Sequence, residues 1–330
     1  MSDSMKRRGF LHRAALASAG GAMAMGAAGG PAAGQGATAP PAAGPPAPAG
    51  DAMPAGKIGS LTVSRLLLGG NLLTHFTHSR DLRYVYDLTA HYNTPEKIMD
   101  TMALAERHGI NTLSVHNPPP IMQTLKRYRQ ERGGKMQWII CPTAPCEAGM
   151  AEYIKQVDAL IDAGADAIYV WGVRGDQLVA QGKIDLMKQA VDIAKAHGVP
   201  SGVGGHDLRV ILACEEHGVG ADFYIKTFHH HKYPSGPKPE QLAAPYAEHP
   251  GYWCKDPDET VRVMKDVKKP WIAFKVMAAG AIPPKDAFPY VVNHGADHLL
   301  VGMFDFEIAE DAKLARQAFA EAQRDRPWCS

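Results

Sequence analysis

Strong charge of either sign is missing from this chain. Its 35 lysine and arginine residues nearly balance 34 aspartate and glutamate residues, which leaves a net charge of +1 on 330 residues. So small a net charge creates no field that would attract nucleic acid or an anionic membrane surface. We therefore expect a small-molecule substrate and no nucleic-acid partner.

Long apolar runs and paired cysteines are also missing. Residues 14–28 are mildly apolar but rich in alanine and glycine, which make a poor transmembrane helix, so no stable membrane span is expected. The five cysteines are an odd number without metal-ligand spacing. Cys141 and Cys146 are close enough in sequence to form a disulfide in an oxidising compartment, but free, buried thiols are the interpretation we favour.

The N-terminus carries an export pattern. The phrase KRRGFL at residues 6–11 precedes the mildly apolar stretch, and this order resembles a twin-arginine signal peptide over residues 1–28. The resemblance implies export of the folded protein to the periplasm by the twin-arginine translocase. Residues 29–55 are almost entirely alanine, proline and glycine. They cannot bury enough apolar surface to fold, so we predict a disordered linker.

Residues 56–330 repeat one pattern, in which short β-rich runs alternate with amphipathic segments at intervals of roughly thirty residues. The predicted strands are Arg65–Gly70, Thr112–His116, Gln137–Pro142, Ala167–Gly172, Pro200–Gly204, Asp222–Thr227, Trp271–Val276 and His298–Gly302. The clearest predicted helices are Pro95–His108, Met150–Ala163, Asp185–His197 and Asp256–Val267. Eight βα units of one composition predict a single α/β domain, a (β/α)₈ TIM barrel. No GxGxxG follows the first strand, which argues against a Rossmann domain.

The carboxyl ends of the strands are where a barrel of this kind carries its chemistry. A lysine at a strand end is partly desolvated, which lowers its pKa and suits Schiff-base or anion-binding chemistry. Histidines at strand ends serve as acid–base groups or metal ligands. The predicted catalytic residues are Lys226, Lys275, His206, His229 and His116.

Substrate and metal contacts are expected from the same strand ends. The predicted substrate-binding residues are Asn71, Trp171, Arg174 and Asp305. The candidate ligands of a divalent metal ion are His206, His229 and His116, without HExxH or a comparable spacing.

Two segments resemble the aldo/keto reductase family. LTVSRLLLGGN (residues 61–71) with ALAERHGINTLSV (103–115) is similar to that family's opening strand, first helix and second strand. LLVGMFDFEIAEDAKLA (299–315) is similar to its closing strand and helix. This resemblance implies a TIM barrel and an NADP-dependent oxidoreductase, although the family's usual catalytic residues have no evident counterpart here.

A shorter phrase points to a different chemistry. GADFYIKT (residues 220–227) is similar to the Schiff-base strand of class I aldolases of the deoxyribose-phosphate type, and Lys275 stands where those enzymes have a second lysine. This resemblance implies lyase chemistry at Lys226.

Taken together, these patterns favour an exported barrel enzyme with a mouth rich in histidine and lysine. Such a mouth stabilises negative charge that develops on an enolate, alkoxide or carboxylate, which suits lyase, isomerase or epimerase chemistry on a small sugar-like or carboxylated substrate. A bound divalent metal would act there as a Lewis acid. The alternatives left open are an NADP-dependent reductase and a ligand-binding barrel without catalysis.

Overall fold

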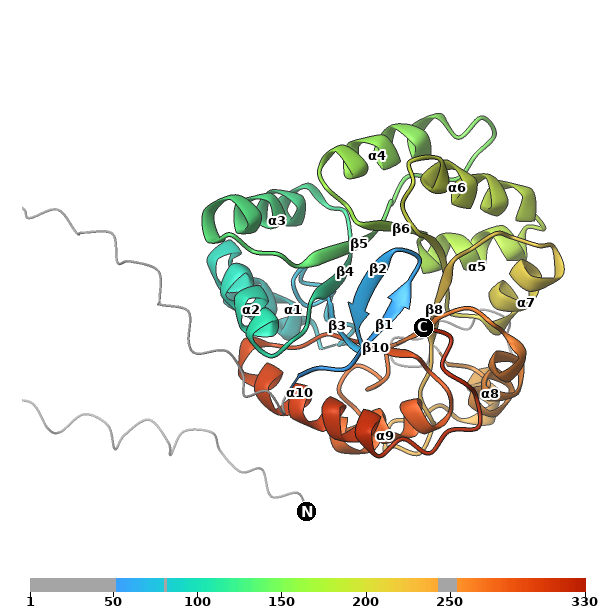
Figure 1. Cartoon of the computed structure of the whole chain (residues 1–330). Coiled ribbons are helices and arrows are strands. Elements are labelled where there is room, and N and C mark those ends of the chain that lie inside the picture. The colour runs from blue at the N-terminus through green and yellow to red at the C-terminus, as the bar shows by residue number, and fades with distance from the viewer. Residues whose placement is uncertain (1–51, 80–81, 243–253) are drawn as a thin grey trace, which may run out of the picture. The chain divides into compact units, whose positions relative to one another are not determined.

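Eight parallel strands form a closed barrel in the computed structural model, which describes residues 52–79, 82–242 and 254–330 (Figure 1). In barrel order the strands are β3 (Leu66–Gly69), β4 (Thr112–His116), β5 (Gln137–Cys141), β6 (Ala167–Val170), β7 (Ser201–Gly205), β8 (Phe223–Thr227), β9 (Trp271–Phe274) and β10 (His298–Val301). β10 pairs with both β9 and β3 and so closes the barrel. The predicted (β/α)₈ fold is confirmed, and each predicted strand end lies within about two residues of the observed one.

Helices surround the strands on the outside (Figure 1). They are α1 (Arg83–Tyr92), α2 (Pro95–Arg107), α3 (Pro119–Arg132), α4 (Ala151–Asp162), α5 (Gly172–Ala180), α6 (Ile184–Ala196), α7 (Leu208–Glu216), α8 (Pro257–Asp266), α9 (Pro284–Asn293) and α10 (Asp305–Ala320), with a 3₁₀ turn η1 (Pro239–Leu242). Several begin with proline, whose fixed φ and missing N–H suit the first helical turn.

Two apolar clusters show which face of each strand points inward. Inside the barrel, Leu67, Ile139, Phe223, Ile225 and Ile272 pack together. The second, larger cluster fills the space between the strands and the helices. Because side chains alternate along a strand, this division places every strand residue either inside the barrel or under a helix.

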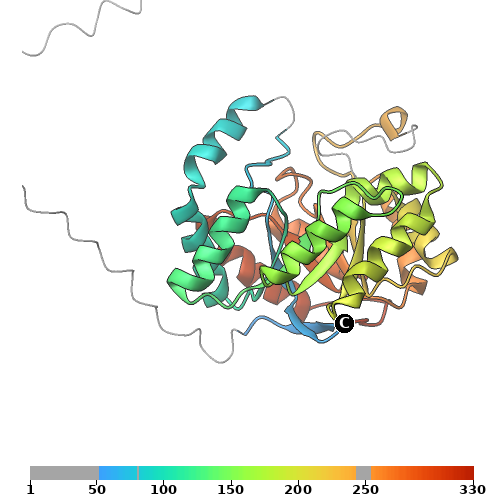
Figure 2. The ribbon, with the colours of Figure 1, turned by 90° about the horizontal axis from the view of Figure 1, so that it is seen from above.

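A short antiparallel hairpin, β1 (Ala55–Ile58) with β2 (Leu61–Ser64), lies across the amino-terminal end of the barrel (Figure 2). Ile58 and Val63 are fully buried in the inner apolar cluster, so the hairpin closes the floor of the barrel. The hairpin is not evident from the sequence, because its strands are only four residues long and follow directly on the alanine- and proline-rich stretch.

The floor also contains a buried ion network. The Asp297 carboxylate, which is fully buried, accepts hydrogen bonds from Arg326 Nη1 (2.6 Å) and Arg324 Nη2 (3.2 Å). It also accepts from the backbone N–H groups of Trp271 and Cys329, at 2.9 and 3.0 Å. Each lone-pair direction of this carboxylate is thus used, as a buried charge requires.

The described cysteines are all free, with Cys141 and Cys146 buried, so no disulfide joins them. None of the helices in the described ranges is long and apolar enough to cross a membrane. The predicted signal peptide and nearly all of the predicted linker fall outside the described residues.

Candidate active site

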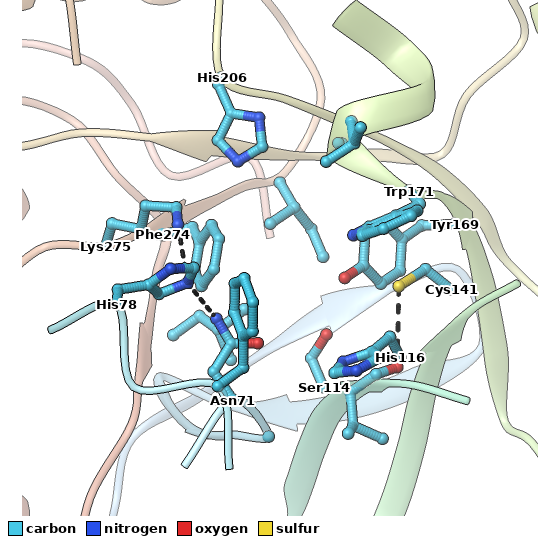
Figure 3. A pocket seen from close by; sticks show the side chains of 18 of the residues that line it. Asn71, His78, Ser114, His116, Cys141, Tyr169, Trp171, His206, Phe274 and Lys275 are labelled. Atoms are coloured by element: carbon cyan, nitrogen blue, oxygen red, sulfur yellow. Dashed lines mark hydrogen bonds between the residues drawn. The ribbon is translucent and has the colours of Figure 1, made fainter. Parts of the chain in front are cut away.

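A cavity of about 440 Å³ opens at the carboxyl ends of the barrel strands (Figure 3). Asn71, His116, Trp171, His206 and Lys275 line it, so the structure brings together five of the residues predicted from sequence. Aromatic side chains supply much of the remaining wall, and no arginine or carboxylate is among the described lining residues. A concave, largely apolar pocket with a few convergent polar groups is typical of a small-molecule site.

His206, which follows β7, forms a buried pair with Asp176 of α5. His206 Nδ1 lies 2.6 Å from Asp176 Oδ2, and Asp176 Oδ1 accepts the backbone N–H groups of His206 and Asp207, at 2.9 and 3.1 Å. Asp176 is 5% exposed. The carboxylate holds the imidazole at Nδ1 while the ring lines the cavity, which is the arrangement of an oriented general base.

A glycine contact brings α5 close enough for this pair to form. A Cβ on Gly175 would collide with the carbonyl oxygen of Gly204 in β7. Only glycine therefore lets the helix approach the strand at this point, and the next residue of the helix is Asp176. The role of Asp176 is missed at the level of sequence, because it lies within a helix and not at a strand end.

Lys275 approaches the cavity from β9 through an unusual backbone conformation. Strand alternation would direct Lys275 outward with Trp271 and Ala273, which pack in the outer cluster. Instead its φ is +57°, a left-handed value that costs a non-glycine residue about 1 kcal/mol or more. As a result, Phe274 and Lys275 both line the cavity although they are consecutive.

His78, from the loop after β3, holds Lys275 in place. His78 Nε2 lies 3.0 Å from Lys275 Nζ and 2.8 Å from Asn71 Nδ2 (Figure 3). Burial lowers the pKa of His78 to about 2, and the nearby charges of Lys275, His206 and His116 lower it further. His78 is therefore neutral and its ring accepts a hydrogen bond from the lysine. His78 was not among the residues predicted for the site, because it lies in a long loop and the sequence does not show which residues a loop residue contacts.

The opposite wall of the cavity is neutral. In the closed barrel β5 lies directly across from β9, and β4 and β6 flank it. These three strands contribute Ser114, His116, Cys141 and Tyr169 to the cavity. Burial raises the pKa of Tyr169 well above its usual value, with Cys141 adding to the effect and Ser114 opposing it, and burial raises that of Cys141 to about 12. Burial lowers the pKa of His116, so this wall presents uncharged polar groups.

Lys226 does not reach the cavity, which corrects its predicted place at the mouth. It shares the outward face of β8 with Tyr224, whereas Phe223 and Ile225 point into the barrel. Its Nζ donates to Thr227 O at 2.8 Å and to Thr227 Oγ1 at 3.1 Å, and burial lowers its pKa. Lys226 therefore cannot form the aldolase-like Schiff base with a substrate in this cavity. The lysine that faces the cavity is Lys275.

His229 is also placed differently from its prediction. It is fully buried beyond the end of β8, does not line the cavity, and has no hydrogen bond of good geometry at either ring nitrogen. Burial lowers its pKa to about 3, with the charges of His231 and Lys226 adding to the effect. The three histidines predicted as metal ligands do not converge, and the described residues contain no group of three or more suitable metal ligands.

Arg174 and Asp305, predicted to bind substrate, lie outside the cavity. Arg174 Nη1 donates to Gln177 Oε1 within α5 at 2.8 Å. Asp305 accepts from Tyr92 Oη at 2.6 Å and from Lys97 Nζ at 3.0 Å on the outer rim. Both side chains are engaged in local contacts because their strand ends turn outward into the following helix.

A second cavity of about 240 Å³ adjoins the first and shares the Lys275–His78 pair as its wall. Glu307, in the first turn of α10, lines it and accepts a hydrogen bond from the N–H of Phe304 at 2.8 Å. Burial, with Glu307 and Glu310 nearby, raises the pKa of Asp311, in the same helix, to about 7. The NADP hypothesis needs a phosphate near this closing helix, and carboxylates at a helix N-terminus repel a phosphate, so this part of the hypothesis finds no support.

Comparison with known proteins finds similarity among solved structures. No family model matches the chain, and no curated protein does. Among solved structures, the chain is similar to a 3-hexulose-6-phosphate synthase at 18% sequence identity and a TM-score of 0.42, with 68% of this chain and 94% of that chain covered. At this level of similarity, the function has to be argued from the residues of the site.

Proposed function

We propose that the protein is an enzyme that moves a proton next to a carbonyl group of a small, polar, oxygenated substrate. The reaction class is then that of an isomerase, an epimerase or a lyase. The observation that carries this proposal is the pair His206–Asp176 facing the same cavity as the pair Lys275–His78.

His206 supplies the base. A carbon-bound proton moves to His206 Nε2, and the Asp176 carboxylate stabilises the resulting imidazolium through its 2.6 Å contact with Nδ1. The same nitrogen then returns the proton to a neighbouring carbon or oxygen. This general acid–base step contributes about 10²- to 10⁴-fold to the rate in enzymes.

Lys275 supplies the opposite charge. As the proton leaves carbon, negative charge develops on the carbonyl oxygen, and a fixed ammonium group stabilises it with little reorganisation. Neutral His78 restrains Lys275 Nζ without cancelling its charge. Lys275 lines the cavity, so its charge lies beside a ligand bound there.

Proton exchange with solvent tests this proposal directly. We expect purified protein to exchange carbon-bound hydrogen of hydroxy-ketones and hydroxy-aldehydes for deuterium in heavy water, as followed by NMR. His206→Gln should lower the exchange rate by about 10²-fold or more, and Asp176→Asn should lower it less. His217→Gln, an exposed histidine after α7, is the control and should leave it unchanged. Equal rates in all variants would contradict the proposal.

A covalent route through Lys275 gives a distinct result. If Lys275 forms a Schiff base with the carbonyl carbon, borohydride reduction in the presence of substrate adds the substrate mass to the protein, and Lys275→Met abolishes the adduct. We expect no adduct, because the Lys275 ammonium group is engaged as a donor to His78. The reductase alternative predicts nicotinamide absorbance in the purified protein, and the binding-only alternative predicts affinity without exchange.

Export through the twin-arginine translocase belongs to the same proposal. Arg7 and Arg8 in the phrase KRRGFL are its basis, and both lie outside the described residues. Changing both to lysine should leave precursor in the cytoplasm. Normal export of that variant would contradict the dependence on the twin-arginine translocase.

A further inference from the structure

The cavity is divided in polarity between its two sides. Lys275 stands on β9, whereas Ser114, Cys141 and Tyr169 stand on the three strands across the barrel. The Ser114 hydroxyl points into the cavity (Figure 3), its residue is 4% exposed, and it forms no hydrogen bond of good geometry, with the Tyr169 phenol as its polar neighbour. A buried hydroxyl left without a good hydrogen bond costs up to about 1–3 kcal/mol, so a ligand hydroxyl that pairs with Ser114 lowers that cost.

The positive groups that a phosphate requires are few. Lys275 is the one lysine at the cavity, and no arginine lines it among the described residues. The N-terminus of α5 also faces the cavity at Gly172 and Val173, but the buried Asp176 carboxylate lies within the same short helix. Phosphate recognition uses arginine, several donors or an uncompensated helix N-terminus. The described lining therefore offers a phosphate one side-chain cation and a helix N-terminus that already carries a carboxylate.

The remaining wall suits a sugar. Trp171, Phe76 and Phe274 line the cavity and offer flat apolar surfaces to the C–H faces of a carbohydrate. Hydroxyl, thiol and imidazole groups on the wall opposite Lys275 match hydroxyl groups, which both donate and accept. The cavity volume of about 440 Å³ lies within the range of small-ligand pockets.

We infer that the substrate is an unphosphorylated sugar, an aldose or ketose, whose carbonyl oxygen lies toward Lys275 and whose far hydroxyl is bound by Ser114. This inference rests on the proposed function, because it places the reacting carbon beside His206. Ser114 and the Tyr169 phenol then determine specificity by hydrogen bonding to a substrate hydroxyl group, and they take no part in proton transfer.

Binding measurements with a matched pair of serines test the inference. The probes are D-fructose, D-xylulose and D-glucose, the phosphate ester of each, and a deoxy analogue of whichever sugar binds best, all measured by calorimetry. Ser114→Ala should weaken binding of the sugar by about tenfold and leave binding of the analogue that lacks the matching hydroxyl unchanged. Ser201→Ala is the control, since Ser201 Oγ is also buried without a hydrogen bond of good geometry but lies at the start of β7, outside the cavity lining.

The outcomes separate the two proposals. Tighter binding of a phosphate ester than of its free sugar, equal effects of the two serine variants, or no binding of any probe would overturn the inference. If no sugar binds but another carbonyl compound undergoes exchange that depends on His206, the substrate class is wrong and the proposed function stands. If a sugar binds as expected but undergoes no exchange in heavy water, the proposed function is wrong and the binding assignment of Ser114 stands.

Discussion

The two ends of the barrel treat charge in opposite ways. At the floor, the Asp297 carboxylate contacts two guanidinium groups and two backbone N–H groups. Arg326 also donates hydrogen bonds to backbone carbonyl groups. At the mouth, the Lys275 ammonium group lies 3.0 Å from a neutral imidazole and lines the cavity. The comparison shows that the charges at the floor are buried within the protein and contribute to stability, whereas the charge at the mouth lies where a ligand can contact it.

The largest effect should come from breaking the floor. Asp297→Ala leaves Arg324 and Arg326 buried without their carboxylate, which should lower the free energy of unfolding by about 3–5 kcal/mol. Urea unfolding followed by circular dichroism measures this. The control is Asp325→Asn, since Asp325 is exposed and 3.7 Å from Lys265, and it should change stability by less than about 0.5 kcal/mol. Similar stabilities for the two variants would contradict the contrast between the ends.

Breaking the mouth should leave the fold intact. Lys275→Met keeps the side-chain stem and removes the charge, so exchange activity should fall by about 10²- to 10³-fold while the urea midpoint stays within error. Lys226→Met removes a buried amine that does not line the cavity, and activity should then fall much less than in Lys275→Met. Equal losses of activity in the two lysine variants would mean that the cavity-facing position of Lys275 has no special role.

The contrast between these two lysines shows where prediction from sequence ended. Strand rhythm located all eight barrel strands, because buried parallel strands and capped helices have strong local patterns. The same alternation assigns both lysines to outward faces, and β8 obeys it. Lys275 departs from this alternation because its φ is positive. A lysine gives no sign of that conformation in the sequence, since positive φ is usually found at glycine.

Other parts of the site depended on tertiary contacts. His206, His116, Trp171 and Asn71 were predictable because they follow strands directly. Asp176 lies in a helix, and it meets His206 only because a glycine lets that helix approach β7. His78 lies in a loop whose course the sequence does not specify. His229 follows a strand, but the chain turns its ring away from the cavity and buries it.

Stability should fall in acid, because two buried histidines resist protonation. Burial lowers the pKa of His298 at the floor to about 4 and that of His229 to about 3, from the ordinary 6.5. Below pH 6.5 the unfolded chain takes up these protons and the folded chain does not, so the free energy of unfolding falls as the pH falls toward 4. Each histidine contributes at most about 1.4 kcal/mol per pH unit.

The variant His229→Leu separates the two histidines. His229 has no hydrogen bond of good geometry, whereas His298 contacts Ser64 O and Ser330 Oγ, at 2.9 and 2.6 Å. Replacing His229 should therefore make stability less dependent on pH between 6.5 and 4 and cost little at pH 7.5. Urea unfolding at four pH values from 7.5 to 4.5 measures the slope. An unchanged slope would mean that His229 is protonated in the folded state.

The smallest expected effect lies beside the mouth, at Asp311. Burial and the carboxylates of Glu307 and Glu310 raise its pKa to about 7. The folded chain then holds a proton that the unfolded chain has released, so Asp311 costs stability as the pH rises from about 4 through 7. Asp311→Asn should raise the free energy of unfolding by about 1 kcal/mol at pH 8 and by less at pH 5. A gain that is the same at both pH values would contradict this origin.

The left-handed backbone at Lys275 makes stability and activity favour different residues at this position. Glycine would adopt φ +57° without strain, so Lys275→Gly relieves the backbone while it deletes the ammonium group. A laboratory selection for heat tolerance alone would therefore tend to discard this lysine, and a selection for turnover would restore it. The residue found at position 275 after such an experiment would therefore indicate whether stability or turnover had been selected.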